Sequence, residues 1–127
     1  MIVLDASAAV AALLRAGPAR AAISDQQVHV PHLVDAEVAH SLRRLVLGGH
    51  LVLDAGTAAL RAWSRLGITR HDVHSLLPRV WDLRENLSAY DATYVALAEA
   101  LGCPLVTADR RLARSAGPAC PITVVPG

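Results

Sequence analysis

Apolar residues along the chain fall into two patterns, which are short continuous runs and longer segments with helical spacing. A short apolar run bounded by turn residues is typical of a strand that is buried on both faces of a parallel sheet. On this basis we expect strands over residues 1–4, 28–30, 68–70, 104–107 and 121–125.

The longer segments place apolar residues three or four positions apart, which predicts amphipathic helices. Glycines such as Gly48, Gly67 and Gly102 follow several of these segments and are expected to end them. The predicted helices cover residues 6–15, 19–24, 32–47, 55–66, 73–83, 88–101 and 109–114. The residues expected to pack the 55–66 and 73–83 helices into the core are Ala59, Ala62, Trp63, Leu66, Leu76, Leu77, Val80 and Trp81.

Strands that alternate with helices indicate an α/β fold, in which a central parallel sheet of four or five strands is flanked by helices on both faces. No repeat, linker or low-complexity stretch divides the chain, so residues 1–127 are expected to form a single domain. Ligands of such sheets bind outside the carboxyl ends of the strands. Functional residues are therefore expected at that edge.

Composition narrows the class of protein further. Hydrophobic residues make up 54% of the 127 residues, yet Phe is absent and only Trp63, Trp81, Tyr90 and Tyr94 are aromatic. Stacking platforms for single-stranded bases are therefore poorly supplied. No charge-free stretch approaches the ~18 apolar residues of a membrane helix, and no positive charge precedes the first apolar run as it does in a signal peptide. We expect no membrane association and a cytoplasmic location.

The basic residues are unusual because all 12 are arginine, although the formal net charge is only +1. Arginine suits bidentate binding of phosphate, but a GC-rich codon composition explains the same bias, and both interpretations stay open. The absence of lysine argues against Walker-type nucleotide sites and haloacid-dehalogenase-like folds in their usual form. The six histidines lack a third ligand at customary spacing, so no zinc site is expected.

Acidic residues stand where predicted strands end. Asp5 directly follows the first strand and Asp109 follows the fourth by two positions, so both lie at the carboxyl edge of the sheet. Asp91 lies in the first turn of the 88–101 helix. Each of these acids is also explained by helix capping, so a binding module without catalysis is one hypothesis for this protein.

Two further acids, Asp35 and Glu37, share a helix but point in different directions, so at most one joins a cluster. Asp35 lies near the helix N-terminus, where the helix dipole alone favours an acid. Glu37 lies deeper, beside the apolar stripe, and has no such explanation. Glu37 is therefore the better candidate for a functional role.

Several segments of the chain carry a family resemblance. They are MIVLDASAAV, DAEVAHSLRRL, SAYDATYVALAEALGCPLVTADRRLA and the closing PITVV. In this order they resemble a PIN domain, specifically a VapC-type toxin ribonuclease of a bacterial toxin–antitoxin pair. The resemblance spans essentially the whole chain, and the long third segment is its most specific part.

The resemblance implies a metal-binding acidic cluster that cuts RNA. The implied catalytic and metal-binding residues are Asp5, Glu37, Asp91 and Asp109. The implied supporting hydroxyl residues are Ser7 and Thr107. Some PIN nucleases carry a fifth acid just after the fourth, but Arg110 and Arg111 occupy that place here.

The chemistry is consistent with these residue types. Four carboxylates within a few ångströms repel one another, and a divalent cation removes the repulsion. Hard oxygen ligands suit Mg²⁺ or Mn²⁺, which hold a phosphate and activate water. The resemblance implies hydrolysis that leaves a 5′-phosphate and a 3′-hydroxyl. Candidates for contact with the RNA backbone are Arg43, Arg44, Arg110 and Arg111, although a place on a solvated helix face is the better explanation for any one of them.

The resemblance also implies partners: a cognate VapB-type antitoxin, an RNA substrate and a second copy in a homodimer. We expect the antitoxin to cover a groove between the helices at 6–15 and 34–47 and to place a basic side chain among the acids. A housekeeping RNA-processing nuclease is the alternative enzyme, and the short chain, with no substrate-selecting segment, argues against it.

The two cysteines, Cys103 and Cys120, each precede a proline that opens a predicted strand. If these strands are parallel neighbours, the cysteines begin them at equivalent points about 5 Å apart. We expect them to be close but reduced, because thiols seldom stay paired in the cytoplasm.

Overall fold

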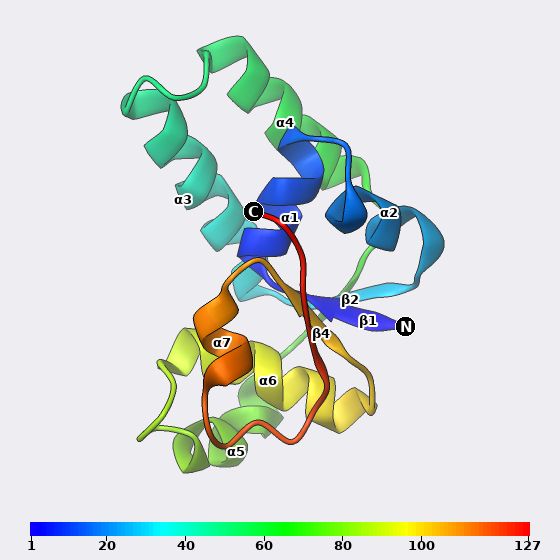
Figure 1. Cartoon of the computed structure of the whole chain (residues 1–127), viewed down its shortest axis with the longest axis vertical. Coiled ribbons are helices and arrows are strands. Elements are labelled where there is room, and N and C mark those ends of the chain that lie inside the picture. Colours follow the sequence, from blue (N-terminus) through cyan, green and yellow to red (C-terminus); the bar gives the residue numbers. More distant parts are fainter.

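A computed structural model describes all residues from 1 to 127 and contains one parallel sheet of five strands (Figure 1). The order of the strands across the sheet is β3-β2-β1-β4-β5, so the first strand lies at the centre. The strands are β1 Ile2–Leu4, β2 Val28–Pro31, β3 Thr69–His71, β4 Leu105–Thr107 and β5 Ile122–Val124. Each predicted strand is present, and the predicted α/β class is confirmed.

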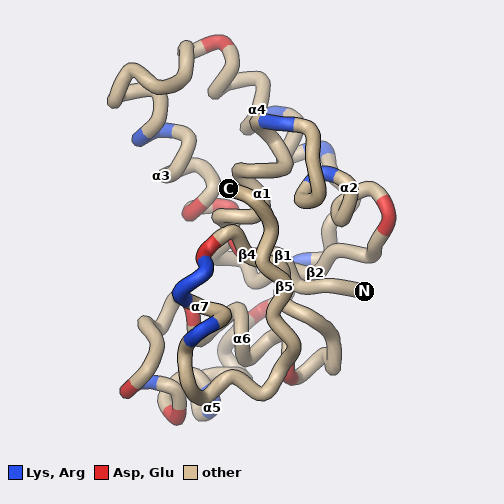
Figure 2. Tube along the Cα trace, in the orientation of Figure 1, with Lys and Arg blue, Asp and Glu red and all other residues tan.

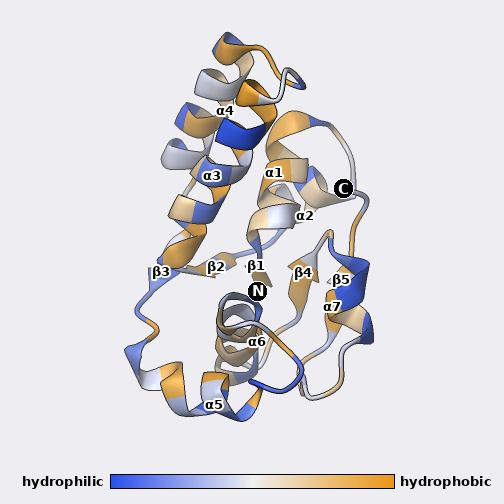
Figure 3. Cartoon of the chain, turned by 90° about the vertical axis from the view of Figure 1, so that its left-hand side faces the viewer, coloured by the Kyte–Doolittle hydropathy of each residue, from blue (hydrophilic) through white to orange (hydrophobic).

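Helices cover both faces of the sheet (Figure 3). One face carries α1 Ala6–Leu14, α2 Pro18–Asp25, α3 Leu33–Leu47 and α4 Leu53–Arg65. The other carries the 3₁₀ turn η1 His74–Leu76 and the helices α5 Leu77–Asp82, α6 Ala89–Leu101 and α7 Arg110–Arg114. None of these helices combines the length and the apolar character that crossing a bilayer requires.

The central helix of the second face is α6, which buries every residue from Ala92 to Ala98. Small side chains alternate here with Val95 and Leu97, so the helix packs closely on β1 and β2. It ends at Gly102, whose φ of 66° lies in the left-handed region that favours glycine. The packing of α6 on β1 and β2 therefore fixes the position of this helix relative to the sheet.

The segment after β3 differs from the prediction of one helix over 73–83. Pro78 has no N–H to donate and takes a place in the first turn of α5, so a separate 3₁₀ turn precedes it. Val80 is buried as predicted, but Leu77 is 53% exposed and Trp81 is 68% exposed. Their predicted burial was wrong because so short a helix covers the core with only one side. In α4, Ala62 is likewise exposed.

Asp35 on α3 connects α3 to strand β3 and to helix α4 through hydrogen bonds. Its carboxylate accepts hydrogen bonds from Arg70 on β3, at 2.7 Å from Nε and 2.9 Å from Nη2. It also accepts one from the buried Trp63 indole on α4, at 2.7 Å. Asp35 therefore has a structural role in joining α3, α4 and β3, which agrees with its predicted separation from the acidic cluster.

Cys103 and Cys120 do begin neighbouring parallel strands. Leu105 pairs with Ile122 in the register of β4 and β5, and each cysteine stands two positions before its paired residue. Both thiols are free. Burial raises the pKa of Cys103 and of Cys120, so both sulfurs stay protonated and poorly reactive at neutral pH.

Candidate active site

Asp5 lies at the centre of the carboxyl edge, directly after β1, and is only 6% exposed. One carboxylate oxygen accepts a hydrogen bond from the Ala8 backbone N–H at 2.9 Å and so caps α1. The same oxygen accepts from Ser7 Oγ at 2.6 Å, and the other accepts from Thr107 Oγ1 at 2.5 Å. Asp5 therefore caps a helix and is also held in one orientation at the sheet edge.

Ser7 and Thr107 join the turn after β1 to the turn after β4. Their hydroxyl oxygens are 3.2 Å apart. The Ala108 N–H donates to Ser7 Oγ at 2.9 Å, and the Asp109 N–H donates to Thr107 Oγ1 at 3.0 Å. The two predicted hydroxyl residues thus fix the backbone that carries Asp109 relative to Asp5.

Glu37 is half-buried on α3 and is held by a residue of α6. Tyr94 donates its hydroxyl hydrogen to Glu37 Oε1 at 2.5 Å. Tyr94 itself is buried, with 2% exposure. From the sequence alone we assigned no functional role to Tyr94, although Tyr94 lies three positions after Asp91 and therefore on the same face of α6. That spacing was the signal that could have found it.

Asp91 and Asp109 lie at the starts of two helices. Ser88 Oγ caps α6 by accepting from the Asp91 N–H at 3.1 Å, which leaves the Asp91 carboxylate uncommitted. Asp109 caps α7 by accepting from the Arg111 N–H at 2.9 Å, and it also pairs with the Arg111 guanidinium at 3.3 Å. Both acids line one cleft of about 220 Å³ together with Arg111.

The charges of Asp5, Glu37 and Asp91 act on one another. Burial raises the pKa of all three carboxyls, and repulsion among the acids adds to it, from Asp91 on Asp5 and from Asp5 and Asp91 on Glu37. For Asp91, the charge of Asp109 raises the pKa further. Asp109 differs because hydrogen bonds from Arg111 lower its pKa. The charges of the four acids are thus linked through Asp91, and the Arg111 guanidinium pairs with Asp109. We call these four acids the acidic cluster. No three of them lie close enough together to hold a metal ion directly.

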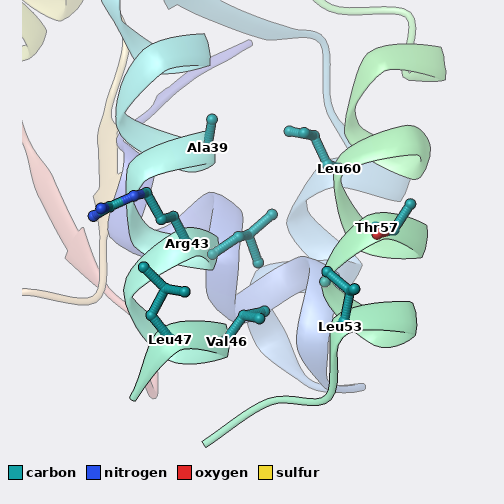
Figure 4. Close-up of a pocket in the computed structure, with 9 residues that line it drawn as sticks. Ala39, Arg43, Val46, Leu47, Leu53, Thr57 and Leu60 are labelled. Atoms are coloured by element: carbon teal, nitrogen blue, oxygen red, sulfur yellow. The ribbon is translucent and has the colours of Figure 1, made fainter. Parts of the chain in front are cut away.

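The four candidate arginines are not equivalent. Arg111 belongs to the cluster, and Arg110 is exposed beside it on the same short helix. The basic positions of α7 directly follow an acidic position on the tube (Figure 2). Arg43 and Arg44 are exposed on α3, and the Arg43 side chain points away from α4 (Figure 4). The structure records no ion pair between either of them and the acids.

An apolar groove of about 300 Å³ lies between α3 and α4 (Figure 4). It is lined by Leu42, Val46, Leu47, Leu53 and Leu60, of which Leu53 is 68% exposed. We had expected a groove between the helices at 6–15 and 34–47. Those helices instead pack directly on each other, and the open apolar surface of α3 faces α4.

Known proteins resemble this chain along nearly its whole length. The PIN domain family matches residues 2–118. Ribonuclease VapC9 of Mycobacterium tuberculosis is 58% identical over 126 residues, which cover 99% of both chains. The chain belongs to the PIN domain family. Within that family its curated relatives are VapC ribonucleases, so this PIN domain is of the VapC type.

Solved structures share the fold of this PIN domain. PAE2754 from Pyrobaculum aerophilum superposes with a TM-score of 0.71 at 25% identity, covering 95% of this chain and 81% of that one. VapC20, the sarcin–ricin loop cleaving toxin of Mycobacterium tuberculosis, superposes with a TM-score of 0.66 at 21% identity, covering 90% and 94%. The arrangement of the sheet and helices in this PIN domain is therefore that of its family.

Proposed function

We propose that this VapC-type PIN domain is a toxin endoribonuclease, which hydrolyses RNA phosphodiester bonds with a divalent metal ion and is neutralised by a cognate antitoxin. The observation that carries the proposal is the placement of Asp5, Glu37 and Asp91, which are all at least partly buried and whose pKa values are raised by that burial and by the charges of neighbouring acids. Clustered carboxylates of this kind are costly unless a cation compensates them. The relatives at up to 58% identity are named ribonucleases.

The residues of the cluster fit Mg²⁺ or Mn²⁺. All the donors are carboxylate oxygens, which these ions prefer. No three of these side chains lie close enough together to hold an ion directly, so Mg²⁺ would bind here through one or two carboxylates and several waters. The residues that would hold the ion are Asp5, Glu37, Asp91 and Asp109. When bound, it supplies phosphate binding, a water of lowered pKa and stabilisation of the leaving oxygen.

The protein's own contribution is to hold the acids in fixed orientations. Ser7 and Thr107 direct both oxygens of Asp5, and Tyr94 directs Glu37. Asp91 keeps its carboxylate free for the site because Ser88 performs the capping of α6. Such preorganisation places the charge before substrate arrives, so no reorganisation is needed during the reaction. No side chain of the cluster is a nucleophile in this scheme, and the products carry a 5′-phosphate and a 3′-hydroxyl.

RNA reaches the cluster past the arginines of α7. Arg111 is held only by two 3.3 Å contacts with Asp109, and its side chain is 90% exposed. It is therefore free to exchange Asp109 for a backbone phosphate, and Arg110 lies next to it for a second contact. Arg43 and Arg44 on α3 would act on more distant phosphates. Exposed arginines of this kind bind without regard to sequence.

The antitoxin covers the apolar groove between α3 and α4 and places a basic side chain among the acids. The exposure of Leu47, Leu53 and Leu60 along this groove is the observation that supports the location. A cation from the partner stabilises the same carboxylates that otherwise need a metal ion. We also propose a homodimer, in which light scattering would give twice the 13.4 kDa mass of the chain.

The decisive experiment compares cleavage of a single-stranded RNA by the wild-type protein and by Asp5→Asn, Glu37→Gln and Asp91→Asn in Mg²⁺. Each variant should lose cleavage while circular dichroism shows an intact fold. Asp35→Asn is the control, because Asp35 is bonded to Arg70 and lies outside the cluster. A fully active Asp91→Asn protein would contradict the proposal.

Growth supplies a second readout for the toxin. Expression of the wild-type chain alone should arrest growth, and co-expression of the small protein encoded beside it should restore growth. The Asp5→Asn chain should be harmless at the same expression level. Equal toxicity of the two chains, or equal harmlessness, would favour a binding module without catalysis.

A further inference from the structure

A hollow of about 410 Å³ adjoins the acidic cluster on the side of α3. It is lined by Ala36, Glu37 and His40 from α3 and by Tyr90 from the start of α6. Its volume falls within the ~300–1,000 Å³ range of small-molecule sites, which is enough for one flat ring system. Glu37 lines this hollow and is also a member of the cluster, so the two are continuous.

Tyr90 is the unusual residue of the hollow. It is 65% exposed, whereas Tyr94, one turn further along α6, is 2% exposed. Its hydroxyl makes no hydrogen bond and its ring stacks on no other ring. The other exposed aromatic side chain, Trp81, differs because the Arg84 guanidinium lies 5.1 Å from its ring centre. Tyr90 is thus a free aromatic face beside Asp91.

The position of Tyr90 defines what it can meet. A strand whose phosphate lies at Asp5, Glu37 and Asp91 carries its neighbouring base toward one side of the cluster, and the hollow lies directly next to Glu37. An unpaired base stacks well on a tyrosine ring, because every base has a flat π-face. His40 stands one helical turn beyond Glu37 and offers a ring nitrogen to the edge of that base.

We infer that the hollow formed by Ala36, Glu37, His40 and Tyr90 is a nucleobase subsite, in which Tyr90 stacks on an unpaired RNA base next to the scissile phosphate. The inference rests on the proposed ribonuclease function and adds to it a requirement for an unstacked base at one position. The scarcity of aromatic residues in the chain excludes a row of stacking platforms. It does not exclude a single one at this place.

The test combines a protein change with the removal of one base. A short single-stranded RNA of mixed sequence is first cut by the wild-type protein in Mg²⁺ to map the scissile bond. Copies of this RNA then carry one abasic ribonucleotide at each position around the bond. KM and kcat are measured for the wild type, Tyr90→Ala and Tyr90→Phe, with Trp81→Ala as a control at an exposed aromatic residue outside the site.

Tyr90→Ala should raise KM for intact RNA by roughly ten-fold, within the range expected from loss of one base–aromatic stack, with little change in kcat. One abasic position should raise KM of the wild type by a similar factor and leave KM of Tyr90→Ala nearly unchanged, because the two changes remove the same contact. Tyr90→Phe and Trp81→Ala should respond as the wild type does.

Three results overturn the inference while leaving the ribonuclease function intact. In the first, Tyr90→Ala cuts with the wild-type KM. In the second, Tyr90→Ala raises KM, but each abasic position raises the KM of Tyr90→Ala by the same factor as it raises the KM of the wild type. Tyr90 then acts on the fold and not on a base. In the third, Tyr90→Ala keeps the wild-type KM but arrests growth even when the antitoxin is co-expressed, so the hollow belongs to the protein partner. Absence of cleavage by the wild type would instead contradict the proposed function itself.

Discussion

At the scale of single residues, Thr107 connects two members of the acidic cluster, Asp5 and Asp109. It is fully buried at the end of β4, and its one hydroxyl donates to Asp5 and accepts from the Asp109 backbone. The hydrogen bond to Asp5 opposes the effect of burial, which raises the pKa of that carboxyl. Thr107 therefore helps to keep Asp5 ionised in a buried place.

Replacing Thr107 by Val should move the acid limb of the cleavage pH profile to higher pH. The hydrogen bond from Thr107 lowers the Asp5 pKa, so its loss raises that pKa. Asp5 then loses its negative charge at a higher pH, and cleavage falls at that higher pH. Stability should fall by roughly 1–3 kcal/mol because the Asp109 N–H loses its acceptor. Thr107→Ser, which keeps the hydroxyl, is the control; an unmoved acid limb in Thr107→Val would count against this role.

Asp35 is the opposite case, an acid with a structural role two positions from Glu37. Asp35→Asn should keep the cleavage rate of the folded protein but lower its stability by about 1 kcal/mol, measured by urea unfolding, because the pair with Arg70 is partly exposed. Arg70 lowers the pKa of Asp35, so this contribution is present above the pKa of the unfolded state and is lost as pH falls below it. Loss of cleavage without unfolding would place Asp35 in the site.

At the scale of elements, the edge strand β3 is joined to β2 by two histidines. His29 Nδ1 and His71 Nε2 are 2.8 Å apart, so one ring donates a hydrogen to the other. Burial, and then the charges of His71 and the N-terminus, lower the pKa of His29. This contact requires one of the two facing nitrogens to be unprotonated.

Acidification should therefore weaken this edge of the sheet. Because the folded-state pKa of His29 is lowered, the unfolded chain binds more protons below about pH 6.5, and stability falls as the pH drops through that value. The raised pKa values of Asp5, Glu37 and Asp91 increase stability on acidification, but this contribution is the same in the wild type and in His29→Gln. The urea midpoint should consequently fall less between about pH 7.5 and about pH 5.5 in His29→Gln than in the wild type. Equal shifts would contradict a role for this pair.

At the scale of the whole molecule, the acidic cluster and the apolar groove are two surfaces that share helix α3. Its carboxyl edge carries the acidic cluster, and the far side of α3 contributes to the apolar groove with α4 (Figure 3). Helix α3 belongs to both, because Glu37 and Leu42 lie little more than one turn apart. A protein that covers the groove is thereby brought close to the acids.

Substitution of Leu53 by Asp should separate inhibition from catalysis. Leu53 is 68% exposed, so the fold tolerates the charge, but a buried carboxylate in a partner interface is costly. The variant should cleave RNA at the wild-type rate and arrest growth even when the antitoxin is co-expressed. Trp81→Asp, at a similarly exposed position on the other face, should remain neutralised. Normal neutralisation of Leu53→Asp would move the partner away from this groove.

Much of this architecture was predictable from the order of residues alone. Continuous apolar runs, glycine ends and capping residues are local signals, and they located the strands and helices to within a few positions. The acids Asp5 and Asp109 were recognisable because they lie one and two positions after the ends of strands. Glu37 was separable from Asp35 because helical geometry sends residues two positions apart in different directions.

The remainder depended on which elements meet in three dimensions. Thr107 reaches Asp5 across 102 positions, and Tyr94 reaches Glu37 across 57, so no local pattern links them. Periodicity likewise showed that α3 and α5 have apolar sides but not which elements cover them. For this reason the groove was expected beside the wrong helix, and Trp81 was expected to be buried. The sequence by itself determined the fold class and the kinds of residues at the site. Only tertiary packing decided their orientations, burial and pKa values, because these arise from neighbours that are distant along the chain.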